Sequence, residues 1–214
     1  MQAESQQYLR ILALSGAFVV AGCTTVTMSE PPQTATEQLL VTTAIDDAIA
    51  KMNVSSIAAG TRIFVDTSFF DGTGRDRTIL FPKYAMGAVR ERLLRAGALL
   101  TDDKQTAEVI VELRTGGQSV DHNSLFVGIP SITIPIPPYF TAPVTTPELS
   151  LFKRDRKTGV AKLAIVAYGR GTGALTGESG ASFGASNHTE YTVLLLFDWI
   201  SSDIEPKELQ DRTK

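Results

Sequence analysis

Residues 180–184 (Gly-Ala-Ser-Phe-Gly) match the G-x-S-x-G pattern that holds the nucleophile of many serine hydrolases. That chemistry needs a strand, a sharp turn that exposes the serine, and a helix behind the turn. Residues 169–187 are instead rich in Gly, Ala, Ser and Thr, and no helical spacing of apolar residues follows Ser182. We therefore expect a flexible loop that matches the pattern through its composition.

The sequence contains two histidines, His122 and His188. His188 follows Ser182 by six residues and would be its base, with Asp198 or Asp121 orienting the ring, so a serine hydrolase is the alternative function. As metal ligands, the two histidines are 66 positions apart and have no carboxylate or thiol at ligand spacing. We predict no catalytic residue, no metal and no cofactor.

A glycine cluster at residues 169–174 fits the pattern G-x-G-x-x-A of dinucleotide-binding proteins. That fingerprint requires a helix whose N-terminus receives the pyrophosphate, and no helical pattern follows the cluster. We interpret it as a long hairpin connection.

Cys23 ends a secretory signal layout in which Arg10 precedes an uncharged apolar run over residues 11–21. The run is about half of the ~20 residues needed to span a bilayer, which indicates a cleaved segment. Val-Ala-Gly-Cys at residues 20–23 resembles the lipobox of bacterial lipoproteins, and this resemblance implies cleavage before Cys23 and lipidation of its thiol. The chain has no other cysteine, so no disulfide is expected.

Removal of a signal peptide over residues 1–22 leaves 192 residues with 19 basic and 22 acidic side chains, a net charge of −3. This balance argues against nucleic acid as a partner. The length suits one domain. We predict a flexible tether over residues 23–33, a single domain over 34–204 and a charged tail over 205–214.

Apolar spacing predicts two helices. The first begins near Thr34 or Thr36, and the second ends before Gly97. Alternation predicts strands at 62–70, 99–114, 148–154, 160–168 and 190–200, with a hairpin turn at 155–159. The fold class expected is α+β: a two-layer sandwich with a mainly antiparallel sheet of about five strands, two helices on one face and a long Pro-rich insertion.

The insertion, residues 122–147, contains no Asp, Glu, Lys or Arg and has six prolines. The prolines favour an extended, edge-like or polyproline conformation. Either the segment completes the core of its own domain, or it docks onto a partner or a membrane. The apolar residues of this possible docking loop are Leu125, Phe126, Ile129, Ile132, Ile134, Ile136, Tyr139 and Phe140.

Residues 34–40 (Thr-Ala-Thr-Glu-Gln-Leu-Leu) and 113–120, together with the lipobox, resemble an uncharacterised bacterial lipoprotein family with a TATEQLL motif. This resemblance implies an envelope location and no catalytic residues. More loosely, the order of strand 62–70, helix 83–96 and strand 107–114 is similar to the modules of outer-membrane assembly lipoproteins, including the lipopolysaccharide-assembly plug and curli-secretion lipoproteins. A lipid-handling or lipopolysaccharide-handling binding module is therefore a further alternative.

These observations predict a lipid-anchored, non-enzymatic interaction component of the cell envelope, with the membrane and an envelope protein as its partners. Thr24 follows the cysteine at the position where an aspartate would resemble the inner-membrane retention signal of enteric bacteria. We therefore expect outer-membrane retention, facing the periplasm.

Overall fold

The computed structural model describes residues 24–30, 34–68, 70, 80–134 and 144–204. The chain divides into two compact units. Unit 1 comprises residues 1–28, 122–156 and 189–201, and unit 2 comprises residues 29–121, 157–188 and 202–214.

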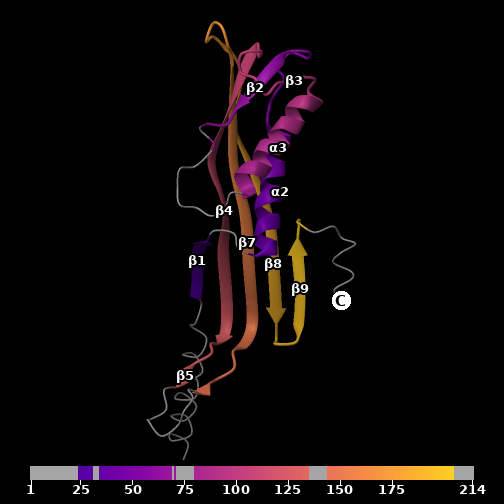
Figure 1. Cartoon of the computed structure of the whole chain (residues 1–214). Helices are drawn as coiled ribbons and strands as arrows, with labels where there is room; N and C mark the ends of the chain where they lie inside the picture. The colour runs from indigo at the N-terminus through magenta and orange to yellow at the C-terminus, as the bar shows by residue number, and fades with distance from the viewer. Residues whose placement is uncertain (1–23, 31–33, 69, 71–79, 135–143, 205–214) are drawn as a thin grey trace, which may run out of the picture. The chain divides into compact units, whose positions relative to one another are not determined.

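The architecture is α+β, with two helices and a seven-stranded mixed sheet among the described residues (Figure 1). The sheet has the order β3-β2-β4-β7-β8-β9, and β1 also pairs with β4. Its strands are β1 (Thr24–Glu30), β2 (Arg62–Asp66), β3 (Leu99–Leu100), β4 (Val109–Ile129), β7 (Leu149–Gly169), β8 (Leu175–Val193) and β9 (Phe197–Ser202). Five of them, β1, β4, β7, β8 and β9, contribute residues to both units.

The sheet differs from the expected antiparallel one because β2 runs parallel to both β3 and β4. Parallel neighbours need a crossover, and helix α3 (Leu80–Arg95) lies between β2 and β3 in the chain. The estimate of about five strands was also low, since β3 and β4 are separate strands and residues 24–30, expected in the tether, form β1.

Both helices of unit 2 begin or end at the residues that the sequence marks. Helix α2 (Ala35–Lys51) has Thr34 as its N-cap, whose hydroxyl accepts a hydrogen bond from the Glu37 N–H at 3.2 Å. The Glu37 carboxylate accepts one from the Thr34 N–H at 2.9 Å, which completes a capping box. Helix α3 is followed by Gly97 at φ 90°, the left-handed C′ position that favours glycine.

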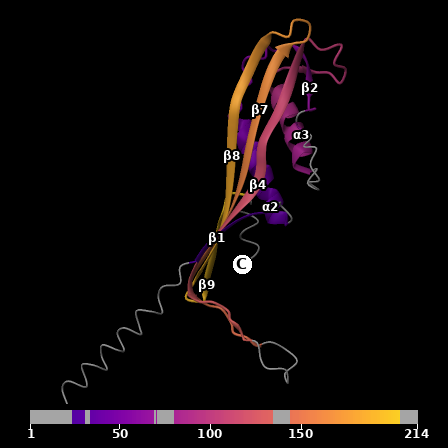
Figure 2. The ribbon, with the colours of Figure 1, turned by 90° about the vertical axis from the view of Figure 1, so that its left-hand side faces the viewer.

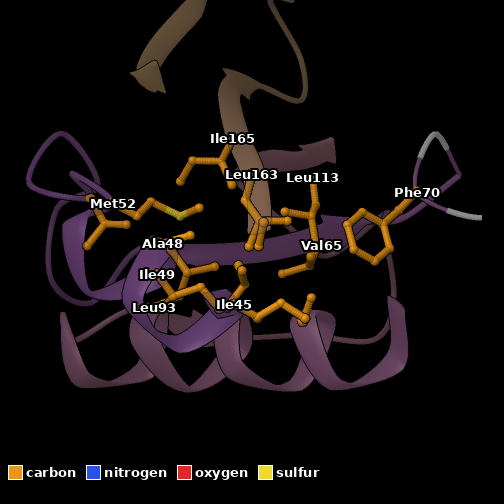
Figure 3. Packing of buried hydrophobic residues seen from close by; sticks show 14 of the residues in the cluster. Ile45, Ala48, Ile49, Met52, Val65, Phe70, Leu93, Leu113, Leu163 and Ile165 are labelled. Atoms are coloured by element: carbon orange, nitrogen blue, oxygen red, sulfur yellow. The ribbon is translucent and has the colours of Figure 1, made fainter. Parts of the chain in front are cut away.

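The hydrophobic core of unit 2 forms where the two helices cover one face of the sheet (Figure 2). Ile45 and Ile49 of α2 and Leu93 of α3 face Leu163 and the other strand residues drawn in Figure 3. Each such buried side chain contributes roughly 1.5 to 3 kcal/mol to folding. No helix within the described part of the chain is long and apolar enough to span a bilayer.

Helix α2 packs closely on β7 and β8 because both strands place very small residues beneath it. A Cβ built on Gly184 would overlap the Ala44 carbonyl oxygen, and one built on Gly159 would overlap that of Leu40. The Ser186 hydroxyl donates a 2.6 Å hydrogen bond to the same Leu40 oxygen. These small residues serve close helix–strand contact.

Two sequence predictions are therefore wrong. Residues 175–187 form part of β8, although a flexible loop was expected over 169–187. Residues 155–159 lie inside β7, although a hairpin turn was expected there. Glycine and serine usually indicate turns, but here their small size admits the α2 backbone.

Polar side chains of α2 also bind the backbone of β8. The Asp47 carboxylate accepts a hydrogen bond from the Ala185 N–H at 3.1 Å, and Lys51 donates to the Phe183 carbonyl oxygen at 3.2 Å. Lys51 and Asp47 form an ion pair at 2.6 Å. The bonds from Lys51 and from the Ala185 N–H lower the pKa of Asp47.

Unit 1 is built from strand ends: the first part of β1, the last of β4, the first of β7 and the hairpin of β8 and β9. Short strands β5 (Thr133–Ile134) and β6 (Val144–Thr145) pair antiparallel within the insertion. The insertion is thus shorter than predicted, since residues 122–129 belong to β4. The predicted strand 190–200 is also interrupted, because residues 194–196 form a turn.

Candidate functional site: an exposed apolar end of unit 1

Ser182 and His188 do not form a nucleophile–base pair. Both lie on β8, six residues apart, and an extended strand rises about 3.3 Å per residue, which separates them by roughly 20 Å. Ser182 is buried in mid-strand, without the exposed turn that a hydrolase nucleophile needs. The His188 Nδ1 lies 3.0 Å from the Ser202 hydroxyl, within hydrogen-bond distance.

The glycine cluster at residues 169–174 connects β7 to β8 in a tight turn. The Gly169 N–H donates to the Ala174 carbonyl oxygen at 2.9 Å, and the Gly173 N–H donates to the Gly169 carbonyl oxygen at 2.8 Å. A strand follows, so the helix that a dinucleotide site requires is missing at this position. The structured ranges also contain no group of three His, Cys, Asp or Glu residues that could hold a metal ion.

A small cavity of about 240 Å³ lies between α2 and α3. Near it the Tyr84 hydroxyl donates to both Asp46 carboxylate oxygens, at 2.8 and 2.9 Å. Burial, together with this carboxylate, raises the pKa of Tyr84 to about 12, so the phenol is neutral near pH 7. On the α3 side Arg95 and Glu91 form an ion pair at 2.6 Å, and Arg92 also lines the cavity. The polar residues at this cavity therefore connect the two helices to each other.

Unit 1 differs from unit 2 in where it places its apolar side chains. Every buried hydrophobic residue identified in the described chain belongs to unit 2. In unit 1 the buried residues are polar, Ser150 and Thr189. Its exposed large hydrophobics are Ile129, Ile132, Leu149, Leu151, Leu194, Leu195, Leu196, Phe197, Trp199 and Ile200.

The centre of this exposed surface is the turn between β8 and β9. Leu194 and Leu195 have φ values of 51° and 64°, the left-handed backbone that type I′ turns require and that Asn and Gly normally supply. For leucine this conformation costs roughly 1 to 2 kcal/mol per residue. Leu196 is 80% exposed and Phe197 is 61% exposed. The sequence thus places four consecutive apolar residues at a strained, exposed turn.

The start of β7 and the end of β4 extend the apolar surface of the turn. The Leu194 N–H donates to the Leu151 carbonyl oxygen at 2.9 Å, which joins the turn to β7. A Cβ built on Gly128 would overlap the Leu149 carbonyl oxygen, so the end of β4 lies against the same part of β7. The end of β4, the start of β7 and the turn between β8 and β9 lie near one another (Figure 1). We call Ile129, Leu149, Leu151, Leu194, Leu195, Leu196 and Phe197 the apolar end.

An aromatic pair lies next to the apolar end. The rings of Tyr191 on β8 and Trp199 on β9 are stacked, with centroids 4.9 Å apart and planes at 11°. Trp199 is the only tryptophan of the chain. Alternate residues of a strand share a face, so Trp199 lies on the same side of β9 as Phe197.

Charged groups at the start of β7, and directly before it, contact one another. Lys153 contacts Glu148 at 3.0 Å and Asp155 at 3.8 Å. The hydrogen bond to Glu148 raises the pKa of Lys153, and the negative charges of Asp155 and Glu190 raise it further. The lysine therefore stays charged at neutral pH beside these carboxylates.

The predicted docking residues differ in how exposed they are. Leu125 and Phe126 are half-buried on β4, whereas Ile129 and Ile132 are exposed, with Ile132 at 54%. Ile134 lies in β5. Cys23, Ile136, Tyr139 and Phe140 lie outside the described residues.

Sequence reasoning missed the turn at Leu194–Leu196, which is the most exposed part of the apolar end. A run of Val, Leu and Phe without Gly, Pro, Asn or Asp is typical of a buried strand. No local signal in the sequence therefore marked this turn.

These features define a class: an α+β protein in which one unit has its own core and the other exposes its apolar residues. A model of a family of unknown function, DUF6655, matches residues 17–197, and the chain belongs to this family. No match was found among curated proteins or among solved structures.

Proposed function

We propose that the protein is a lipid-anchored, non-enzymatic component of the cell envelope that acts through the exposed apolar surface of unit 1. The observation that carries the proposal is the contrast in burial: the hydrophobics found buried belong to unit 2, while ten large ones in unit 1 are exposed. Apolar surface of this extent is a characteristic of contact sites.

Cys23 is the proposed attachment point, with outer-membrane retention and a periplasm-facing domain. It directly precedes Thr24, and residues 24–28 belong to unit 1. A lipid on Cys23 would hold unit 1 close to a membrane, and such confinement raises the effective concentration of nearby partners. The resemblance to lipoproteins with a TATEQLL motif supports this location.

The uncharged segment 122–147 is the proposed contact with an envelope partner. Ile129 and Ile132 are exposed on either side of Pro130, before the β5–β6 hairpin. A finding that Phe126, Ile132, Ile134 and Tyr139 are all buried would have opposed this role, but Ile132 is exposed and Phe126 is only half-buried.

Lipidation is tested with Cys23→Ala in the bacterium that makes the protein. The variant is expected to leave the membrane pellet and to appear in the soluble fraction, whereas wild-type processing is expected to be blocked by globomycin. A Cys23→Ala chain that pellets as the wild type does, together with wild-type processing that globomycin leaves unchanged, would refute the lipid anchor.

The non-enzymatic part of the proposal is tested with a fluorophosphonate probe. No labelling of Ser182 is expected, because that side chain is buried in mid-strand, and Ser182→Ala serves as the reference. Labelling that Ser182→Ala abolishes would instead establish a hydrolase.

A further inference from the structure

We infer that the turn Leu194–Phe197, together with Leu149 and Leu151, inserts into a lipid bilayer and forms a second membrane contact of unit 1. This inference rests on the proposed lipid anchor, which brings the domain to a membrane. It concerns a different part of the chain, and the two contacts are tested separately below.

The form of the apolar end favours lipid over a protein partner. The turn presents Leu194, Leu195, Leu196 and Phe197 in sequence, and each is about half or more exposed. A protein interface would need a surface complementary to these four side chains. A bilayer accepts apolar side chains of any arrangement, because the acyl chains are fluid and the gain depends on buried apolar area.

The backbone of the turn supports the same interpretation. Leucine is unfavourable at φ 51° and 64°, where Asn-Gly would relieve the strain and increase solubility. The chain instead keeps two leucines at the positions where turn chemistry demands polar or glycine residues. Strain of this kind is retained where side-chain identity serves a function.

The order of residue types along the hairpin matches the layers of a membrane surface. Apolar residues occupy the turn, the stacked Tyr191 and Trp199 follow, and Tyr and Trp are the residues enriched at the membrane–water interface. Lys153 on β7 pairs with Asp155 of the same strand and with Glu148, which precedes the strand. Asp198 lies between Phe197 and Trp199 in sequence, so it points to the opposite face of β9.

The start of the described chain lies in the same unit. Residues 24–28 belong to unit 1, and β1 begins toward the end at which β8 turns into β9 (Figure 1). Lipids on Cys23 would therefore enter the membrane near the apolar end, which allows both to insert into one leaflet.

Trp199 provides a direct reporter, because it is the only tryptophan and lies two residues beyond Phe197. The lipidated full chain is reconstituted into vesicles of phosphatidylethanolamine and phosphatidylglycerol with brominated acyl chains, which quench tryptophan by contact. We expect the Trp199 fluorescence to fall at least twofold relative to vesicles without bromine.

The variant Leu194→Asn/Leu195→Gly removes two apolar side chains and supplies the residues that this backbone prefers, so the fold is retained. Quenching is expected to fall severalfold, while the chain stays in the membrane pellet through its lipid. Leu175→Asn is the matched control, because Leu175 is 63% exposed in unit 2 and its variant should be quenched as the wild type is.

Wild-type Trp199 that bromolipids leave unquenched would overturn the inference while the Cys23 test still stands. Concentration-dependent self-association that the Asn-Gly variant abolishes, without quenching in the wild type, would assign the apolar end to a second copy of the chain and would also overturn it. Conversely, a Cys23→Ser chain that still pellets and whose Trp199 is quenched would show that the turn holds the chain on the membrane without a lipid, whereas wild-type processing that globomycin leaves unchanged would refute the lipid anchor alone.

Discussion

Unit 2 and unit 1 share strands of one sheet and use apolar residues in opposite ways. In unit 2 the alternate residues of β7, from Ala161 to Ala167, are buried beneath two helices. In unit 1 the same strand presents Leu149 and Leu151 to the surface. The difference teaches that apolar alternation along one strand is buried only where helices cover its face, as α2 and α3 do in unit 2.

The largest effect should follow from a cavity in unit 2. Leu163 is fully buried, so Leu163→Ala is expected to lower the free energy of unfolding by about 3 kcal/mol. Leu151→Ala in unit 1, at 59% exposure, should change it by less than about 0.5 kcal/mol. Urea titration followed by circular dichroism compares the two. A loss of similar size in Leu151→Ala would show that unit 1 has a core of its own.

A smaller loss is expected where α2 contacts β8. In Gly184→Ala the added methyl group meets the backbone of Ala44 and Ala48, and such overpacking costs about 1 to 3 kcal/mol. Gly171→Ala is the matched control, because a Cβ there meets no atom within 4 Å. Thermal unfolding measures both. Equal midpoints for the two variants would mean that α2 does not depend on the small residues of β8.

The smallest effect is a pH dependence at the end of β2 in unit 2. Hydrogen bonds from Ser68 and Lys104 lower the pKa of Asp66 from 3.8 to about 2. A carboxyl with a lowered folded pKa contributes stability that is complete above its unfolded pKa and is lost as the pH falls from about 4 toward 2. We expect this contribution to be roughly 1 kcal/mol after solvent screening.

Asp66→Asn should remove that part of the acid dependence, as measured by urea midpoints between pH 2 and 7. Asp102→Asn serves as the control, since the Asp102 side chain is 90% exposed in its ion pair with Arg90. If Asp66→Asn and the wild type lose stability in parallel below pH 4, the Ser68 and Lys104 contacts do not stabilise the fold.

The helices were predictable from sequence because their signals are local. The capping box at Thr34 and the glycine at position 97 each act within a few residues, and the structure confirms both. The strand order of the sheet depends on which segments pair across the chain, which no local pattern specifies.

The errors in β7 and β8 have one physical cause. Gly159 and Gly184 leave room for the backbone of α2, which is distant in sequence. In the sequence, a glycine that admits a helix backbone cannot be distinguished from a glycine that forms a turn. The apolar end was missed for the opposite reason, because Leu194 and Leu195 adopt a turn that their residue type disfavours. The absence of charge over 122–147 is visible in the sequence, but the sequence left open whether the isoleucines of this segment are exposed or complete the core.

The bonds from α2 to the backbone of β8 have a consequence for the behaviour of the chain at high concentration. A strand with free N–H and C=O groups invites pairing with a strand of another molecule, which is the first step of amyloid-like growth. Asp47 and Lys51 already engage the Ala185 N–H and the Phe183 carbonyl oxygen. Helix α2 thereby occupies two backbone groups of this glycine-rich and serine-rich strand that could otherwise pair with a strand of a second molecule.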